Sequence, residues 1–448
     1  MKNKPTFESK TISVVTKRLL PFLMLLYLIA YLDRSNISVA ALQMNADLGL
    51  SAKMYGIGAG LFYITYIIFE IPSNIILTKV GARRWIARIM VTWGLVAIGM
   101  AFIKTANQLY TMRLLLGTAE AGFTPGIIYY LSQWFPSNSR AKAMSYFYIA
   151  AALASVIGLP LSGALLGLDG FFNFAGWRWL YLIEGVPALI LGFVVLKYLP
   201  SGIEKARWLL EEQKKWLTEA IASETKSITS EKSLGWYAIF KDSNVWLLSL
   251  FWLLQSFGTI GITLFLPQIL KGISGGSNMM VSLLSALPFL FACVFMYFNS
   301  KNSDFTGERR FHLGIPLLIS GFLLISAIYM GTTVTFVFLT ASIALNWAVT
   351  PVFWALTTEY LSGGPVAAGS IALINAMANL AGATLPYLIG YLRDITGNYD
   401  YALWIVGIAL ISGGFLGISL ARKLSENRSA IKIMDHNNLL IENPEVKF

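Results

Sequence analysis

The sequence predicts an all-α membrane protein in which twelve transmembrane helices form two pseudo-symmetric bundles of six. Hydrophobic residues make up 56% of the chain and charged residues only 13%, whereas a soluble domain carries about 25% charged residues. Twelve apolar stretches are long enough to cross about 30 Å of hydrocarbon. One long polar connection, at 200–243, divides these stretches six and six.

The predicted spans follow one another closely, apart from the gap between the sixth and the seventh. They lie near 19–42, 54–78, 85–103, 108–131, 143–168, 178–199, 245–270, 279–299, 312–330, 334–358, 367–391 and 400–421. We expect five parts: a tail at 1–18, a six-helix bundle at 19–199, a linker at 200–243, a second bundle at 244–422 and a tail at 423–448. The first apolar stretch is too long for the apolar core of a secretion signal, so we read it as a membrane helix.

Lysine and arginine are unevenly distributed over the connections. With the N-terminus inside, the cytoplasmic tails and loops hold 27 of these residues and the opposite loops hold five, while Arg34 and Arg113 lie within spans. Because positive residues accumulate on the cytoplasmic side, both termini are predicted to be cytoplasmic. The same distribution accounts for the net charge of +11 without a nucleic-acid partner. The expected location is a bacterial inner membrane.

Within the linker, residues 203–224 have the pattern of an amphipathic helix. Trp208, Leu209, Trp216 and Leu217 recur at roughly helical spacing among charged neighbours. We expect this helix to lie along the inner face of the membrane. Nothing in its sequence argues for a regulatory role.

Four charged residues interrupt the apolar spans of the first bundle. Asp33 and Arg34 are adjacent in the first span, and Arg113 and Glu120 lie in the fourth. A charge at this depth costs about 2.5–3.5 kcal/mol even on a lenient scale, so such residues persist where they face a protein-lined or water-filled pathway. Arg113, Gly117 and Glu120 share one helix face because they are spaced four and three residues apart. We predict that the four charges form the centre of a transporter; the alternative is a structural ion pair of Arg113 with Asp33 or Glu120.

Similar sequences recur in the loops after the second and the eighth spans. Each has a glycine followed by an arginine pair: N-I-I-L-T-K-V-G-A-R-R at 74–84 and S-K-N-S-D-F-T-G-E-R-R at 300–310. A matched pair in two halves indicates an internal repeat. The pair resembles the loop signature of the major facilitator superfamily. Thr78 replaces the signature's aspartate in the first copy, and Phe305 replaces a basic residue in the second.

Three further motifs narrow the resemblance to the anion:cation symporter family of that superfamily. They read Y-L-D-R-S-N-I at 31–37, G-x-x-E-A-G at 117–122 and G-W-R-W-L-Y-L-I-E-G-V-P at 176–187. The resemblance implies the major facilitator fold, with a central cavity that opens alternately to the two sides. It also implies uptake, together with protons, of a small organic anion such as a sugar acid or a tartrate-like hydroxy-dicarboxylate.

The resemblance assigns roles to the four membrane charges. Asp33 and Glu120 match carboxylates that take up and release protons, and Arg34 and Arg113 match the family's membrane arginines. The physics agrees, since a low-dielectric site favours a protonated carboxyl and a nearby arginine favours the ionised one. We predict that Arg34 binds the substrate carboxylate, that Asp33 and Glu120 carry protons, and that Arg113 tunes the protonation of these two acids.

Uncharged polar residues in both bundles are candidates for contact with substrate hydroxyls. We select Tyr31, Asn36 and Tyr66 in the first bundle and Gln255, Trp354, Asn375 and Asn379 in the second. The alternative for each is a hydrogen bond between helices. Glu70 in the second span has no assigned role, and Arg178 and Glu184 in the sixth are expected at the membrane boundary or in packing.

The sequence lacks the parts of an enzyme. It has two histidines and one cysteine, no cluster with metal-ligand spacing and no phosphate-binding glycine loop. We therefore expect no cofactor, with protons as the coupling ion, and a monomer. The open alternatives are an organic-anion exchanger, an aromatic-acid or drug transporter on the same fold, and a sensor that has lost transport.

Overall fold

The computed structural model describes residues 6–230, 240–361 and 365–442, and these residues form helices joined by short loops. The first half runs through α1 (Phe7–Asp47), α2 (Ala52–Val80), α3 (Ala82–Met100), α4 (Ala106–Glu120), α5 (Phe123–Ser132), α6 (Ser137–Leu166) and α7 (Gly176–Tyr198). The second half runs through α10 (Ser243–Ser256), the π-helical η3 (Phe257–Ile262), α11 (Thr263–Ser274), α12 (Asn278–Thr306), α13 (Arg310–Ala327), α14 (Thr332–Ala348), α15 (Thr350–Leu361), α16 (Pro365–Thr396) and α17 (Asp400–Glu442).

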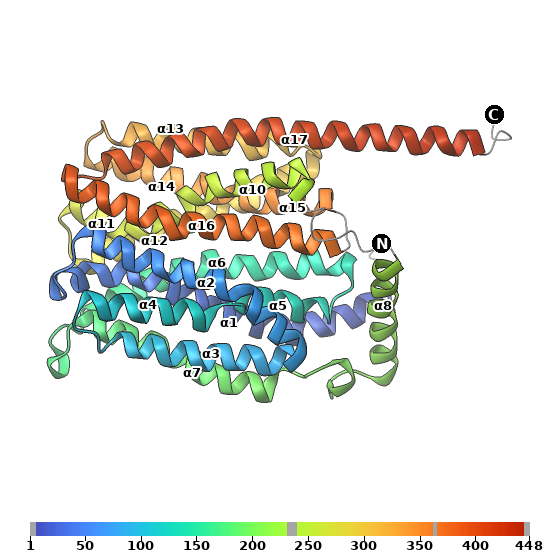
Figure 1. The fold of residues 1–448 in the computed structure, drawn as a ribbon, viewed down its shortest axis with the longest axis horizontal. Coiled ribbons are helices and arrows are strands. Elements are labelled where there is room, and N and C mark those ends of the chain that lie inside the picture. The colour runs from blue at the N-terminus through green and yellow to red at the C-terminus, as the bar shows by residue number, and fades with distance from the viewer. Residues whose placement is uncertain (1–5, 231–239, 362–364, 443–448) are drawn as a thin grey trace.

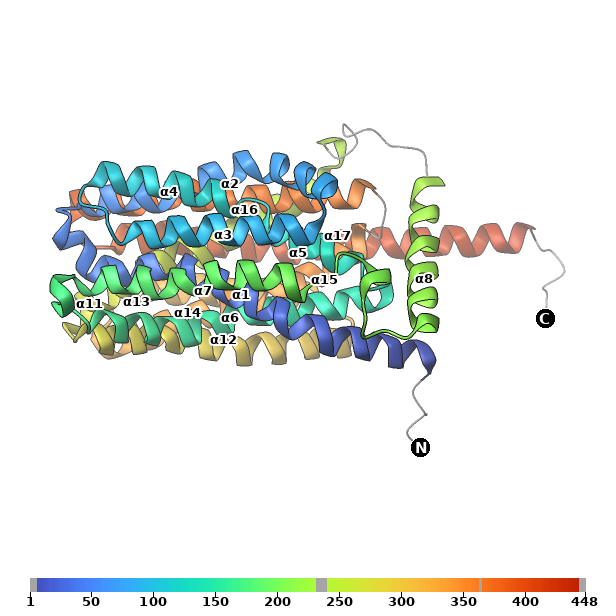
Figure 2. The same ribbon diagram turned by 90° about the horizontal axis from the view of Figure 1, so that it is seen from below.

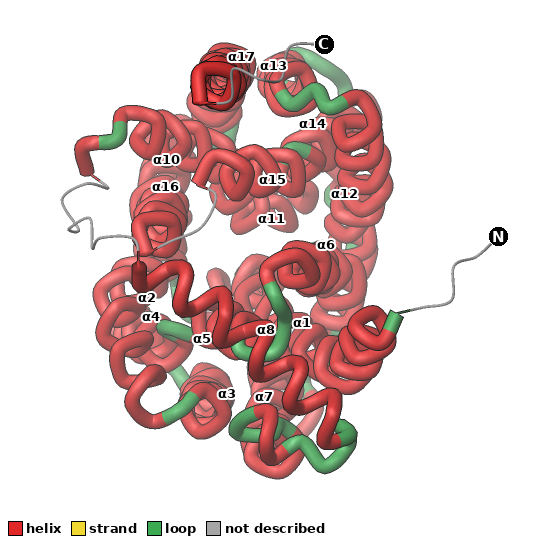
Figure 3. Tube along the Cα trace, turned by 90° about the vertical axis from the view of Figure 1, so that its right-hand side faces the viewer, coloured by secondary structure: helices red, strands yellow, loops and turns green. Residues whose placement is uncertain are grey.

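These helices account for the twelve predicted spans. Nine helices within the described ranges are long and apolar enough to cross a membrane, and the other three spans correspond to α3, to α4 with α5, and to α6. The helices run side by side along the long axis (Figure 1). Seen from one end, the two halves form neighbouring groups, with α2 beside α16 and α6 beside α12 (Figure 3). The predicted all-helical fold is confirmed.

The outer surface of the bundles is apolar. Ile68, Phe193, Phe298 and Ile408 are each more than half exposed, and they lie on four different membrane helices. Contiguous exposed apolar surface on this scale is incompatible with water and matches a lipid environment. The chain is therefore a multi-pass membrane protein.

The two loop glycines of the repeated signature each end a helix at a positive φ. Gly81 follows α2 with φ 94°, and Gly307 follows α12 with φ 67°. Only glycine adopts such angles without steric cost, so both loops need it at the point where the chain turns back. In the second copy, Arg309 pairs with Asp304 (2.6 Å) and with Glu359 of α15 (2.8 Å). The loop thereby joins the ends of α12 and α15.

The amphipathic helix of the linker begins and ends later than the predicted 203–224. Residues Ile203–Lys205 form a short 3-10 turn (η2), and the amphipathic helix α8 spans Glu211–Ser230. The stretch between them packs against the first bundle instead, because the Trp208 ring stacks on Trp134 at 5.6 Å and Leu209 is buried. Figures 1 and 2 show α8 lying across the ends of the spans, at the end where both termini lie.

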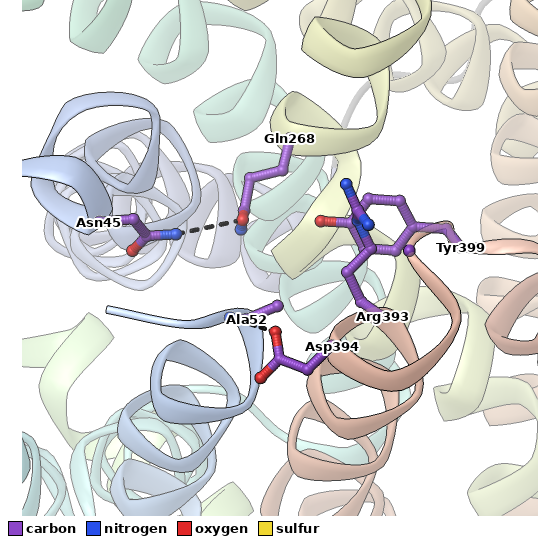
Figure 4. A pocket seen from close by; sticks show the side chains of 7 residues that line it. Asn45, Ala52, Gln268, Arg393, Asp394 and Tyr399 are labelled. Carbon is purple, nitrogen blue, oxygen red and sulfur yellow. Dashed lines mark hydrogen bonds between the residues drawn. The ribbon is translucent and has the colours of Figure 1, made fainter. Parts of the chain in front are cut away.

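The two halves are hydrogen-bonded at the opposite end of the molecule. The Asp394 carboxylate of α16 accepts hydrogen bonds from the backbone amides of Ala52 and Lys53, both at 2.9 Å. These amides are the first two of α2, so Asp394 satisfies free donors and the positive end of the helix dipole across the boundary. Asn45 of α1 also donates to Gln268 of α11 at 3.2 Å. Figure 4 shows these groups around a cavity of about 330 Å³ lined by Asn45, Ala52, Gln268, Arg393, Asp394, Gly397 and Tyr399.

Replacing Asp394 by Ala should loosen this end of the molecule. The two amides of α2 would lose their charged acceptor, so the population in which the halves are separated here should rise. Distances between spin labels on the adjoining ends of α2 and α16 should lengthen in pulsed resonance experiments. Asp47→Ala is the matched control, because the partners of Asp47, Trp177 and Arg178, both belong to the first half. Equal distance distributions for wild type and Asp394→Ala would contradict the assignment.

Candidate functional site

Asp33 lies on the inner face of α1 and is enclosed by protein, with 2% of its surface exposed. The Trp93 indole of α3 donates to Asp33 Oδ2 (2.8 Å) and the Asn36 amide donates to Oδ1 (3.1 Å). Each carboxylate oxygen therefore has a neutral donor, which compensates for the loss of water. The sequence analysis missed Trp93, because a tryptophan in an apolar helix is usually a packing residue.

The shortest ion pair in the membrane interior joins α1 to α4. Arg34 Nε donates to Glu120 Oε1 at 2.6 Å. The Glu120 side chain is fully buried, while 19% of the Arg34 side chain is exposed. Burial makes the carboxylate dependent on its cation, because an unpaired charge in this setting is strongly unfavourable. The ion pair thus combines an enclosed acid with a cation that is still accessible.

Aromatic rings surround the Arg34 guanidinium. Its Cζ atom lies 5.0 Å from the ring centroid of Tyr66, and 5.7 Å from the centroids of both Tyr31 and Phe62. At these distances the rings attract the cation through their quadrupoles. The predicted residues Tyr31 and Tyr66 are brought to Arg34, whereas Phe62 was missed because it reads as an ordinary apolar residue. Glu70, one turn beyond Tyr66, forms no ion pair with a described side chain.

The fourth span breaks directly after Glu120, whereas a continuous helix was expected. Ala121 is extended (φ −53°, ψ 129°) and Gly122 is left-handed (φ 86°). Ser73 of α2 donates to the freed Ala121 carbonyl at 2.7 Å. A side chain at Gly122 would meet Ser73 itself. Glu120 consequently stands at the C-terminal, negative end of a helix, which increases its need for Arg34.

Arg113 is buried against α2, with 2% of its surface exposed. It donates from Nε to the Gly58 carbonyl (3.1 Å) and from Nη2 to the Ala59 carbonyl (3.4 Å), and its Cζ lies 4.8 Å from the Phe62 centroid. Among the described residues it forms no ion pair, so the alternative structural pair with Asp33 or Glu120 is absent. Arg34 and Arg113 instead both contact the ring of Phe62.

In the second bundle, Gln255 lies where α10 gives way to the π-helical turn. It is buried, and its amide donates to the Asn346 carbonyl of α14 at 3.2 Å. Asn346 in turn donates to Thr259 of the π-helical turn at 3.1 Å. Gln255 therefore has the interhelical role that was its alternative. A π-helical turn is a frequent companion of functional sites, and the sequence pattern does not predict it.

Three other predicted residues of the second bundle remain partly exposed: Trp354, Asn375 and Asn379. The Trp354 ring packs edge-on against Trp252 and Phe353, each at 5.3 Å. Asn375 and Asn379 lie on α16, and neither amide forms a hydrogen bond with another described residue. One turn after Asn379, a Cβ at Gly382 would touch the Tyr63 ring of α2. The two free amides are thus accessible on a helix that packs closely against the first bundle.

The comparison with known families agrees with the all-helical fold. The family model of the Major Facilitator Superfamily matches residues 23–370. The chain belongs to the major facilitator superfamily. It is therefore a transporter of small molecules and not an enzyme, as the sequence analysis predicted.

Individual relatives of this major facilitator protein cover nearly its whole length. It is 42% identical over 432 residues to the "Putative tartrate transporter" of Agrobacterium vitis, with 96% of this chain and 99% of the relative covered. It is 37% identical to the "Quinolone resistance transporter" of Acinetobacter baumannii, with 94% and 98% covered. Among solved structures, a bacterial homologue of the human lysosomal transporter Spinster aligns with a TM-score of 0.75 at 17% identity, covering 92% of this chain and 98% of that one. That structural likeness supports the fold alone.

Replacing Trp93 by Phe should destabilise the protein, because it removes the indole donor from an enclosed carboxylate. The expected loss in free energy of unfolding is about 1–3 kcal/mol, measured by reversible unfolding in mixed micelles. Trp177→Phe is the matched control: Trp177 also donates to a carboxylate, at 2.9 Å, but 42% of the accepting Asp47 side chain is exposed to water. The expected loss in free energy of unfolding for Trp177→Phe is smaller. Equal losses in the two variants would show that the Trp93–Asp33 hydrogen bond contributes no more to stability than an exposed one.

Proposed function

We propose that this protein is a proton-coupled symporter that takes up a small organic anion, a sugar acid or hydroxy-dicarboxylate, by alternating access. The observation that carries the proposal is the Arg34–Glu120 pair. The Arg34 side chain is 19% exposed and that of Glu120 is not exposed, so we infer that a substrate reaches the guanidinium but not the acid. An anionic substrate and Glu120 therefore compete for one guanidinium.

This competition couples the anion to a proton. When a substrate carboxylate binds Arg34, Glu120 is left unpaired in a buried position at the negative end of α4. The unpaired charge is relieved when a proton binds and an O–H bond forms on Glu120. One anionic charge and one proton thus enter together. Asp33 is the second proton carrier, and Arg113, close to both Phe62 and the α2 carbonyls, sets the local potential.

The substrate class is argued from groups that remain available. Guanidinium recognises carboxylate, and the free amides of Asn375 and Asn379 offer donors and acceptors that suit hydroxyl groups. Tyr31 and Tyr66 add hydroxyls beside Arg34. The relative from Agrobacterium vitis, whose name specifies tartrate, supports a hydroxy-dicarboxylate.

An aromatic substrate is the second candidate. Trp252, Phe353 and Trp354 form a stacked and edge-on cluster in the second bundle, with Trp252 and Phe353 parallel at 4.5 Å. The side chain of Trp354 is partly exposed and offers a ring face to a planar ligand. The relative named for quinolone resistance supports this reading. Exchange of organic anions is the remaining alternative on the same site.

We further propose that the protein works as a monomer in the inner membrane with both termini in the cytoplasm. The 27 basic residues predicted on one side support this orientation. The amphipathic helix α8, at the end where the termini lie, would then rest on the cytoplasmic membrane surface.

Glu120→Gln should abolish proton-driven accumulation of the anion and leave counterflow exchange intact. The amide keeps the shape of the side chain and mimics the protonated acid, so the substrate still binds but no proton is released. Proteoliposomes with an imposed pH gradient measure accumulation, and counterflow is measured without one. Asp47→Asn, an acid at the end of the bundle, is the control and should accumulate normally. Undiminished accumulation by Glu120→Gln would remove its assigned role.

Asn375→Ala should weaken binding of hydroxylated anions selectively. A neutral hydrogen bond contributes about 0.5–1.5 kcal/mol, so the Kd for tartrate should rise about two- to twelvefold. The Kd for succinate, which lacks the hydroxyls, should stay unchanged. Calorimetry on the purified protein measures the Kd of each ligand. Thr358→Ala is a control on α15, since its hydroxyl bonds only its own helix. Equal losses for the two ligands would exclude a hydroxyl-reading role.

A further inference from the structure

Glu184 on α7 is a second enclosed acid that the proposed coupling scheme does not use. It was expected at the membrane boundary or in packing, but only 6% of its surface is exposed and it lies in the interior of the first bundle. Ser162 of α6 donates to Glu184 Oε1 at 2.7 Å. The other oxygen, Oε2, is buried and has no hydrogen-bond partner. Arg178, two turns earlier, is a boundary residue as predicted, since it binds Asp47 and the loop carbonyls of Ala101 and Ile103.

Asn36 lies between Glu184 and Asp33. Its Nδ2 donates to Asp33 Oδ1 at 3.1 Å, and its side chain is also close to the Glu184 carboxyl. The orientation of the amide is set by Asp33, which accepts and cannot donate when ionised. The Asn36 Oδ1 atom is consequently directed away from Asp33, and it is buried without a donor.

Two buried acceptors, Glu184 Oε2 and Asn36 Oδ1, are therefore left without a hydrogen-bond donor. A proton on Glu184 Oε2 supplies the missing donor for Asn36 and removes a buried charge in the same step. We propose that Glu184 is a third proton-binding site, joined to Asp33 through Asn36. In this series of hydrogen bonds, Glu184 O–H donates to Asn36 Oδ1, and Asn36 Nδ2 donates to Asp33.

The surroundings of Glu184 favour its neutral form. Among the described side chains it has no cation within ion-pair distance, and the α3 residues that pack against α7 beside it, Ala97 and Ile98, are apolar. The ionisable groups facing this region are Asp33 on α1, Tyr181 one turn back on α7, and Arg113 on α4, which acts on Asp33 and Tyr181. Asp33 has two donors and nearby guanidinium charge, whereas Glu184 has one hydroxyl donor. Of two neighbouring acids, the one with fewer donors keeps the proton.

The pair can exchange a proton without changing its total charge. The O–H bond of Glu184 breaks, an O–H bond forms on Asp33, and the negative charge moves from Asp33 to Glu184. The Asn36 amide turns over in this exchange, so that Oδ1 accepts from Asp33, Nδ2 donates to Glu184, and Asn36 remains an amide. Under the proposed function, Glu184 would thus hold a proton in reserve for Asp33. Only the role as a proton reserve depends on the proposed symport function. The proton bound to Glu184 does not depend on transport.

Infrared spectroscopy of the purified protein tests the bound proton directly. At neutral pH the wild type should show a protonated-carboxyl band that is lost in Glu184→Gln, a variant of the same shape and without charge. Asp47→Asn changes an acid that is 42% exposed and paired with Arg178, and it should remove no such band. If Glu184→Gln does not yield folded protein, Ser162→Ala replaces it: loss of the hydroxyl donor should move the band to higher wavenumber.

Coupling to Asp33 is tested by titrating the same band. In Asp33→Asn the neighbouring negative charge is absent, so Glu184 should release its proton at lower pH than in the wild type. An unchanged spectrum in both Glu184→Gln and Ser162→Ala would overturn the proton site, and an unchanged titration would overturn its link to Asp33. Neither result depends on transport, so failure here is distinct from failure of the accumulation test on Glu120.

Discussion

The Arg34–Glu120 ion pair is the contact on which the interior of the first bundle depends. A carboxylate with no exposed surface persists in a membrane protein only if a cation or a proton neutralises it. Arg34 meets that requirement and is itself held by three aromatic rings from α1 and α2. Since 19% of the Arg34 side chain is exposed, the proposed binding of an anion to Arg34 would be linked to the stability of the pair. The proposed coupling scheme rests on this shared cation.

The backbone around Glu120 lowers the stability of its ionised form, and so affects the ion pair with Arg34. The break after Glu120 places the acid at the negative end of α4, and Ser73 satisfies the carbonyl that the break exposes. Trp85 of α3 donates to the same Ser73 hydroxyl at 2.9 Å, so three helices meet at the break. A helix that continued through this position would remove the unfavourable dipole contact. In the proposed mechanism, the broken helix would therefore disfavour the ionised form of Glu120 once Arg34 binds the substrate.

The three buried acids of the first bundle differ in the groups that stabilise their carboxylates. Glu120 has a cation, Asp33 has two neutral donors with guanidinium charge nearby, and Glu184 has one hydroxyl. Such a graded series separates the proton affinities of neighbouring acids. The second bundle contributes amides, a π-helical turn and aromatic rings near its inner helices. The division between a charged half and a polar, aromatic half is consistent with the proposed transport of a small anion.

The sequence by itself determined the number and order of the spans, the repeated loop sequence, and the presence of four charges within the spans of the first bundle. Apolar length and charge at depth are local properties, and the bilayer penalises every exception to them. The sequence also identified Gly81 and Gly307, because a turn that needs positive φ leaves few other residues. Only the tertiary structure decided that Glu120 pairs with Arg34 and not with Arg113, that Trp93 and Asn36 support Asp33, and that Glu184 is enclosed beside them. These choices depend on which helix faces meet across the bundle, on the break after Glu120 and on side-chain reach, and residue spacing along one helix carries no information about a partner on another.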